Sequence, residues 1–249
     1  IVNTPHNPTG RVYSRDDLRF LVELAHRRGL WLLSDEAYSD FVLDGSFVSV
    51  GSLDPEKRHL VVVNSLSKNM GMSGWRIGYA IAHPDFIQVL LKINQHVITC
   101  GPTILLLYCA HYFDDILSHT LPQVRQVVEK RGRVGRTLRE LGLTALPGGA
   151  TFYYFVNIDP YPGTSLDFGL ELLQQHSVAV VPGFAYGKSV DRFVRVGVGT
   201  ESEERISRGL RRLKELSTSR TSGILASSEK SIEAMAEDAD TPGMRPAAK

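Results

Sequence analysis

Four short polar motifs and one separate arginine hold the side chains of this sequence that are best suited to chemistry. They are Asn7-Pro8-Thr9-Gly10, Asp35-Glu36-Ala37-Tyr38, Ser65-Leu66-Ser67-Lys68, Ser73-Gly74-Trp75-Arg76-Ile77-Gly78 and Arg195. A lysine amine becomes a nucleophile and a base when cationic neighbours and removal from water lower its pKa. An arginine offers a planar pair of hydrogen bonds to a phosphate or a carboxylate. The set therefore has the residue types of a lysine-based covalent catalyst.

Each motif taken alone also has an ordinary structural explanation. Asn-Pro-Thr-Gly is a good turn sequence, and the acidic pair at 35–36 can cap a helix. Lys68 can be a solvated loop lysine, the serines can satisfy backbone groups in a turn, and the arginines can form ion pairs. Taken together these explanations fail, because two of the motifs stand where successive predicted strands end.

The elements that must position these motifs indicate an α/β fold. Short, continuous apolar runs at 30–34, 60–64 and 77–82 predict strands, and such runs alternating with helices favour a parallel sheet covered on both faces. Ser14 with Asp17 predicts a helix start and Gly29 its end. Ligands bind beyond the carboxyl ends of the strands in such sheets, where the motifs at 35–38 and 65–68 lie.

The second half of the chain predicts a smaller α+β unit. Helices are expected from Pro84 to about residue 96 and over 121–141, followed by strands at 152–158, 178–181 and 193–198 with a helix at 165–176. Thr200-Glu201-Ser202-Glu203 reads as a capping box. We expect three parts: a partial large domain at 1–141, a small domain at 142–216, and a disordered tail at 217–249, which has no aromatic residue.

Composition excludes several classes of protein. The chain has 249 residues, is 43% hydrophobic, and carries 28 Lys and Arg against 27 Asp and Glu, so no charge excess points to nucleic acid or an anionic membrane. Cys100 and Cys109 are too few for a disulfide framework or a four-cysteine zinc site, and we expect both to be buried. No run approaches the roughly 20 apolar residues of a membrane span. The sequence predicts a soluble, cytoplasmic protein with no metal site.

The order and spacing of the motifs resemble those of the class I/II pyridoxal-phosphate-dependent aminotransferases of fold type I. The resemblance runs from residue 3 to about 215. It implies an incomplete, mostly parallel sheet domain with helices on both faces and a smaller C-terminal α+β domain. It further implies the cofactor pyridoxal 5'-phosphate and transfer of an amino group between an α-amino acid and a 2-oxo acid.

The resemblance assigns catalytic roles to three residues. Lys68 is expected to form the Schiff base with the cofactor and then to move a proton, and Asp35 to pair with the pyridine nitrogen. Tyr38 is expected to hydrogen-bond the ring oxygen of the cofactor together with Asn7. The organic chemistry belongs to the cofactor, which the protein binds and tunes.

The resemblance also assigns the anion-binding residues. Ser65, Ser67 and Arg76 are expected to hold the cofactor phosphate, although strand-like alternation could turn Ser67 away. Arg195 matches the arginine that binds the substrate α-carboxylate, and the resemblance implies that Asn7 also binds the substrate. Arg192 is its competitor within the same segment, but the two are an odd number of positions apart and so do not share a strand face.

Three further features of the sequence leave alternatives open. Pro182-Gly183 is either a loop that closes near the substrate or a plain turn. The aromatic run 152–154 offers a wall for the substrate, although core packing explains at least one of its members. Residues 99–103 either approach the phosphate of a neighbouring subunit in a homodimer or form a buried helix turn.

The family's usual N-terminal portion, which precedes Asn7, is absent from this sequence. We expect the chain to be truncated or half of a split protein that binds cofactor poorly by itself. Two other functions stay open: a pyridoxal-phosphate-dependent lyase or synthase on the same scaffold, and the aminotransferase-like sensor domain of a transcription regulator. The identity of the amino acid lies beyond the sequence.

Overall fold

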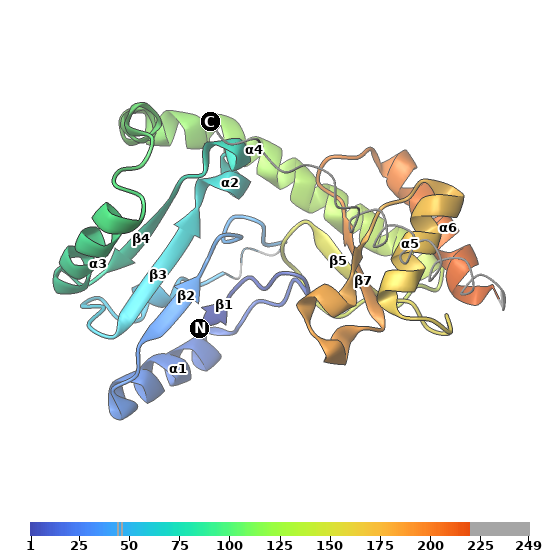
Figure 1. Ribbon diagram of the computed structural model, residues 1–249, viewed down its shortest axis with the longest axis horizontal. Coiled ribbons are helices and arrows are strands. Elements are labelled where there is room, and N and C mark those ends of the chain that lie inside the picture. Colours follow the sequence, from blue (N-terminus) through green and yellow to red (C-terminus); the bar gives the residue numbers. More distant parts are fainter. Residues whose placement is uncertain (44, 46, 220–249) are drawn as a thin grey trace, which may run out of the picture.

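The computed structural model describes residues 1–43, 45 and 47–219, which contain two β-sheets joined by a long helix (Figure 1). The first sheet has the order β1-β2-β3-β4, with bounds Val2–Asn3, Leu32–Asp35, Leu60–Ser65 and Gly78–Ala82. Most of the predicted disordered tail, 217–249, lies outside the described residues. Its first two residues, 217 and 218, belong to the helix Glu203–Thr218, which was expected to end at 216.

The first sheet is mixed rather than wholly parallel. β1, β2 and β3 run parallel, whereas β4 runs antiparallel to β3 with Ser65 opposite Gly78. Only the short segment 66–77 joins these two strands, which is too brief for the crossover helix that a parallel pair requires. The expectation of a parallel third strand was therefore wrong in direction, although the strand itself is present.

Helix α1 (Arg15–Arg28) covers one face of this sheet. Ser14 and Asp17 form the predicted capping box, and Gly29 ends the helix in the left-handed conformation. The apolar stripe of α1 packs against side chains of β2 and β3, which makes a buried cluster at the centre of the sheet: Leu18, Val22, Ala25, Leu32, Val50, Leu60 and Val62. This cluster holds the strands whose carboxyl ends carry the candidate site.

Helices α3 (Pro84–Val97) and α4 (Thr103–Glu140) follow the first sheet, and α4 extends alongside both sheets in Figure 1. The predicted helix over 121–141 is the second part of α4, so its expected start was wrong by 18 residues. Pro122 lies inside this helix, and the backbone departs from helical geometry at Tyr112, ten residues earlier. Residues 98–102 are not helical and are largely exposed, so they do not form a buried helix turn.

The second sheet is antiparallel and contains β5 (Tyr153–Asn157), β6 (Val181–Pro182) and β7 (Phe193–Gly197), in the spatial order β5-β7-β6. Helices α5 (Ser165–His176) and α6 (Glu203–Thr218) pack with the end of α4 over one core. Several side chains of this core are almost fully buried: Val156, Ile158, Phe168, Leu172, Val194, Leu210 and Leu213.

Three local expectations need correction. The strand predicted at 178–181 is present only as the two residues of β6, since the preceding residues return from α5 without pairing. Ser202, rather than Thr200, caps α6, and it accepts from the backbone of Arg205. Cys109 is buried as expected, but Cys100 is exposed because it lies in the non-helical segment before α4.

Neither a membrane span nor a metal cluster was expected from the sequence. Within the residues that the structure describes, no helix combines the length and the apolar character that crossing a bilayer would take.

Candidate active site

The carboxyl ends of the parallel strands bring the first three motifs together. Asn3 pairs with Asp35, and Asp35 in turn lies opposite Val63 of β3. Asp35 is the last residue of β2 and Ser65 the last residue of β3, so both side chains stand at the same edge of the sheet. Parallel pairing thus brings the three motifs at 7–10, 35–38 and 65–68 to one edge of the sheet. We call this group of side chains the polar edge.

The turn that carries Asn7 is fixed to the end of β2. The Asn7 N–H donates to Asn3 Oδ1 at 2.9 Å, and Asn3 Nδ2 donates to the carbonyl oxygen of Asp35 at 3.1 Å. The Thr4 N–H donates to the same carbonyl oxygen at 3.0 Å. These bonds hold the amide of Asn7 close to the carboxyl end of β2.

Two adjacent carboxylic acids at the end of β2 have different environments. Asp35 is half-buried, and its Oδ1 accepts from the Ala37 N–H at 3.1 Å. Glu36 is only 3% exposed and points the other way, accepting from the Val50 N–H at 2.9 Å and from the Ser34 hydroxyl at 3.1 Å. Burial raises the pKa of Glu36 despite these bonds. Asp35 faces the polar edge, and Glu36 anchors the loop behind it.

Lys68 lies on the short helix α2 (Leu66–Asn69), which begins directly after β3. Ser65 caps this helix, because its Oγ accepts from the Ser67 N–H at 3.3 Å. The Lys68 Nζ lies 5.8 Å from the ring centre of Tyr38 and 6.0 Å from that of Phe152. Among the described residues, no carboxylate lies within 4.0 Å of this amine. Ser67 belongs to a helix, so the strand-like alternation considered for it does not apply.

The hydroxyl of Tyr38 connects the first sheet to the second. Tyr38 is 5% exposed, and its hydroxyl donates to the Tyr153 hydroxyl at 3.5 Å. Burial, followed by the hydrogen bond to Tyr153, raises the pKa of Tyr38 above its ordinary value, while the charge of Arg195 partly opposes this. Tyr38 is therefore a protonated hydrogen-bond donor at neutral pH.

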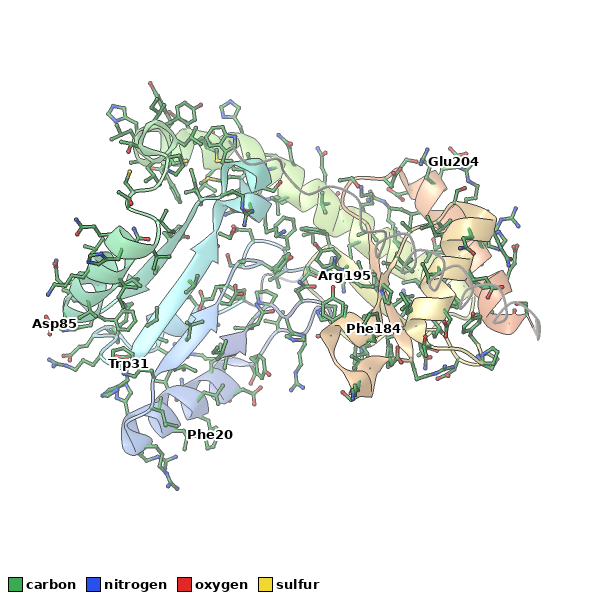
Figure 2. The ribbon with its side chains drawn as sticks, in the orientation of Figure 1. Phe20, Trp31, Asp85, Phe184, Arg195 and Glu204 are labelled. Atoms are coloured by element: carbon green, nitrogen blue, oxygen red, sulfur yellow. The ribbon has the colours of Figure 1, made fainter. Side chains whose placement is uncertain are left out.

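Arg195 supplies a cation from the second sheet. Its guanidinium carbon lies 4.1 Å from the ring centre of Tyr153 and 5.6 Å from that of Tyr186, and Nη1 donates to Asn7 Oδ1 at 3.1 Å. Figure 2 shows Arg195 on the side of the second sheet that is turned toward the first. A guanidinium stacked on aromatic rings keeps its remaining donors free for an anion.

Arg192, the competing arginine, has a structural role instead. It forms an ion pair with Asp159 and donates from Nη1 to the carbonyl oxygen of Gly163 at 2.6 Å. A third bond from Nη2 reaches the carbonyl oxygen of Tyr161 at 2.5 Å. These contacts use Arg192 to hold the loop between β5 and α5, away from Arg195.

Arg76 is the predicted site residue whose side chain contacts its own turn rather than the other site residues. It follows the turn Ser73–Trp75, adopts the left-handed conformation with φ of 57°, and is exposed. Its Nη1 donates to the carbonyl oxygen of Ser73 at 2.9 Å. The contacts that connect Lys68, Tyr38 and Arg195 do not extend to this guanidinium.

The aromatic run 152–154 divides between two surfaces. Phe152 lies near Lys68 and Tyr153 supports Arg195, whereas the Tyr154 hydroxyl donates to the carbonyl oxygen of Arg131 in α4 at 2.7 Å. Tyr154 therefore packs behind the strand. Tyr186, in the turn Gly183–Tyr186 that follows β6, was not predicted from sequence, and no spacing or motif in the sequence marks it.

Comparison with known proteins agrees with this geometry. A family model described as "Aminotransferase class I and II" matches residues 1–213. The chain belongs to this family. A putative aminotransferase of Bacillus subtilis, YugH, is 32% identical over 214 residues, which cover 86% of this chain and 55% of the relative. An aspartate aminotransferase of Pyrococcus abyssi is 33% identical over 207 residues, covering 82% of this chain and 53% of that protein.

Solved structures give the same result for the fold. An aromatic aminotransferase from Pyrococcus horikoshii matches with a TM-score of 0.79 and 29% identity, covering 86% of this chain and 58% of the other. An aspartate aminotransferase from Thermotoga maritima matches with a TM-score of 0.77 and 31% identity, covering 88% and 56%. The chain thus has the fold type I architecture and spans little more than half the length of the relatives it matches.

The residues of the polar edge fit the cofactor of this family, pyridoxal phosphate. Lys68 offers an amine with no carboxylate partner among the described residues, and Asp35 offers a half-buried carboxylate. Tyr38 and Asn7 offer a hydroxyl and an amide. The arrangement can therefore hold the ring of the cofactor, whereas Arg76 has no contact with this group of residues.

Proposed function

We propose that the protein is a pyridoxal-phosphate-dependent aminotransferase that moves an amino group between an α-amino acid and a 2-oxo acid. One observation carries the proposal: the amine of Lys68 and the guanidinium of Arg195 belong to a single run of contacts through Tyr38 and Tyr153. An amino acid has an amine to exchange and a carboxylate to be held, so a catalyst for it needs both groups in one place.

The chain's own residues would divide the work as follows. Arg195 and Asn7 hold the α-carboxylate of the substrate, and the Lys68 Nζ takes up and returns the proton of the substrate Cα. Asp35 would hold the pyridine nitrogen, Tyr38 and Asn7 the ring oxygen, and Ser65 and Ser67 the phosphate. Arg76 would join the phosphate ligands only by exchanging its bond to the Ser73 carbonyl oxygen for one to the phosphate. When bound, the cofactor supplies an aldehyde for the amine and a ring that accepts electrons.

The surroundings of Lys68 leave its amine outside any ion pair. Its Nζ lies 5.8 Å from the ring centre of Tyr38 and 6.0 Å from that of Phe152, and no carboxylate among the described residues lies within 4.0 Å of it. The amine is therefore not committed to a partner within the part of the chain that the structure describes.

We extend the proposal to the organisation of the whole protein. Residues 1–141 form part of a large cofactor-binding domain and residues 142–216 a small domain. The protein acts in the cytoplasm as a homodimer on small amino and oxo acids. The two relatives named above are both described as aminotransferases, which supports the reaction without identifying the substrate of this chain.

The experiment is a half-reaction. The protein expressed from its complete reading frame, loaded with pyridoxal phosphate, is incubated with single amino acids while its absorbance is recorded. We expect conversion to the pyridoxamine form with at least one amino acid and regeneration by a 2-oxo acid. Consumption of an amino acid without the pyridoxamine form would indicate elimination or decarboxylation instead, and a protein that takes up no cofactor would contradict both.

A further inference from the structure

Arg131 is a buried arginine in the C-terminal third of α4 that none of the roles above uses. It is 3% exposed, and among the described residues it makes no ion pair with a carboxylate. Burial lowers its pKa. Removing a guanidinium from water is costly unless its donors are satisfied by hydrogen bonds. The contacts that satisfy it therefore indicate what the residue holds in place.

The guanidinium of Arg131 binds the backbone on two sides. Nε donates to the carbonyl oxygen of Tyr153 at 3.2 Å, and Nη2 donates to that of Gly148 at 2.8 Å. Its carbon also lies 4.3 Å from the ring centre of Tyr154. One rigid, planar group thus connects α4 to the start of β5 and to the loop that precedes it.

The first of these contacts reaches the support of Arg195. Successive side chains of a strand point to opposite faces, so Tyr154 faces Arg131 while Tyr153 faces the site. The ring of Tyr153 lies under the guanidinium of Arg195 at 4.1 Å, and its hydroxyl accepts from Tyr38. The backbone position of Tyr153, which Arg131 holds, therefore sets where Arg195 rests.

The second contact reaches the turn that carries Asn7. A Cβ added to Gly148 would lie 2.3 Å from the carbonyl oxygen of Thr9, and one added to Gly10 would lie 2.9 Å from Arg131 Nη2. The Ala150 N–H donates to the carbonyl oxygen of Gly10 at 3.0 Å. The two loops are therefore in tight contact beside Arg131.

We propose that Arg131 is a positioning residue for the Arg195–Asn7 pair. It holds both supports of that pair, the strand under Arg195 and the loop against the Asn7 turn, from a single guanidinium. That the pair binds a carboxylate rests on the proposed function; that Arg131 fixes its geometry does not. A lysine, with a point charge in place of the planar fork, cannot bridge both carbonyl oxygens in the same way.

The test compares Arg131→Lys and Arg131→Met with Arg133→Lys in the complete, cofactor-loaded protein. Arg133 lies two residues along α4, is partly exposed and pairs with Glu203 at 2.7 Å, so it is a matched control on the same helix. Backbone amide exchange is measured at residues 7–10 and 148–153, and the pyridoxamine half-reaction is titrated with L-glutamate. Thermal melting shows which variants are folded.

We expect faster exchange in both segments for the two Arg131 variants and no change for Arg133→Lys. The half-saturating concentration of L-glutamate should rise about tenfold in Arg131→Met and less in Arg131→Lys, with the limiting rate nearly kept, because Lys68 is untouched. If Arg131→Met does not fold, Arg131→Lys carries the test.

Unchanged exchange in a folded Arg131 variant would overturn the inference. So would faster exchange with an unchanged half-saturating concentration, since the residue would then support the fold and not the site. An Arg131→Lys variant equal to the wild type in both measurements would also contradict the two-carbonyl bridge. If the wild type does not react with L-glutamate or any other amino acid, the proposed function fails, and amide exchange decides the positioning role by itself.

Discussion

The two sheets present their functional side chains in different ways. The first sheet places Asp35 and Ser65 at the last positions of parallel strands and Lys68 just beyond, where neighbouring strands end side by side. The second sheet places Arg195 in the middle of the antiparallel strand β7, between the fully buried Val194 and the partly buried Val196. The position of Lys68 therefore depends on where strand β3 ends. The position of Arg195 depends instead on which face of strand β7 its side chain occupies.

The supports of the two regions differ as well. The first region is held by hydrogen bonds of side chains to nearby backbone, such as Asn3 to Asp35 and Ser65 to Ser67. In the second region aromatic rings lie under the guanidinium, and a buried arginine holds the strand that carries one of them. Substitutions should therefore impair chemistry in the first region and binding in the second.

The largest effect is expected at Lys68. Lys68→Ala removes the amine that the proposal uses as nucleophile and base, so turnover should fall by about a thousandfold or more, the range of a lost acid–base residue. Lys68→Arg keeps a positive charge and should be equally inactive. Turnover by the purified variants measures this, and substantial activity in either would break the assignment of chemistry to the first region.

Arg195 should give the next largest effect, on binding. Arg195→Met removes the cation on Tyr153 and should raise the half-saturating substrate concentration by about a hundredfold, the cost of leaving a carboxylate without its partner. Arg192→Met is the control on the same strand segment, because Arg192 pairs with Asp159 outside the site. A larger binding defect in the Arg192 variant would reverse the roles of the two arginines.

Tyr38 joins the two regions, so Tyr38→Phe should affect both by a moderate amount. The variant keeps the ring beside Lys68 and loses the hydroxyl that bonds Tyr153. A lost hydrogen bond of about 1 kcal/mol corresponds to a five- to tenfold loss in the ratio of limiting rate to half-saturating concentration. Steady-state kinetics measure the ratio, and Tyr161→Phe, whose hydroxyl bonds Glu171 in α5, is the control. An equal loss in both variants would remove any special role of Tyr38.

The smallest effect is expected on stability at Glu36. Burial raises its pKa, so the stability it contributes is complete below its ordinary pKa and falls as pH rises through the raised value. Glu36→Gln does not titrate, so wild type should lose about 1 kcal/mol or less relative to the variant between pH 4.5 and pH 7.5. Urea unfolding at the two pH values measures the difference. A gap that widens in favour of wild type at the higher pH would contradict the sign.

Local signals in the sequence predicted the elements that are short-range in origin. Ser14 with Asp17 and Gly29 marks both ends of α1, and helix α5 occupies the residues expected of it. The order of motifs at strand ends predicted that Asp35 and Ser65 meet at one edge. These features depend on caps, periodicity and strand length, which a sequence displays directly.

Other features depend on partners distant in the sequence and could not be predicted. The start of α4 was missed for two reasons. The first half of the helix exposes apolar side chains and is kinked at Tyr112, and Pro122 then interrupts the helical pattern. The use of Tyr154 against α4 follows from packing between elements, which leaves no local pattern. The direction of β4 follows instead from the short connection 66–77, a local feature of the sequence that the expectation of a parallel sheet did not take into account. In the sequence, Arg131 is one of several arginines on a predicted basic helix, and nothing there distinguishes it from the others.

The sequence by itself indicated the family and the α/β class and predicted a set of cofactor-binding residues, because each rests on residue types in a fixed order along the chain. The motif favoured Arg195 over Arg192, but tertiary structure alone decided that Arg192 pairs with Asp159 and that Arg131 stands behind both supports of the site. The physical reason is that a guanidinium has no role until its partners are known. Burial, stacking and hydrogen bonds to carbonyl oxygens from distant segments assign that role, and only the folded chain brings those segments together.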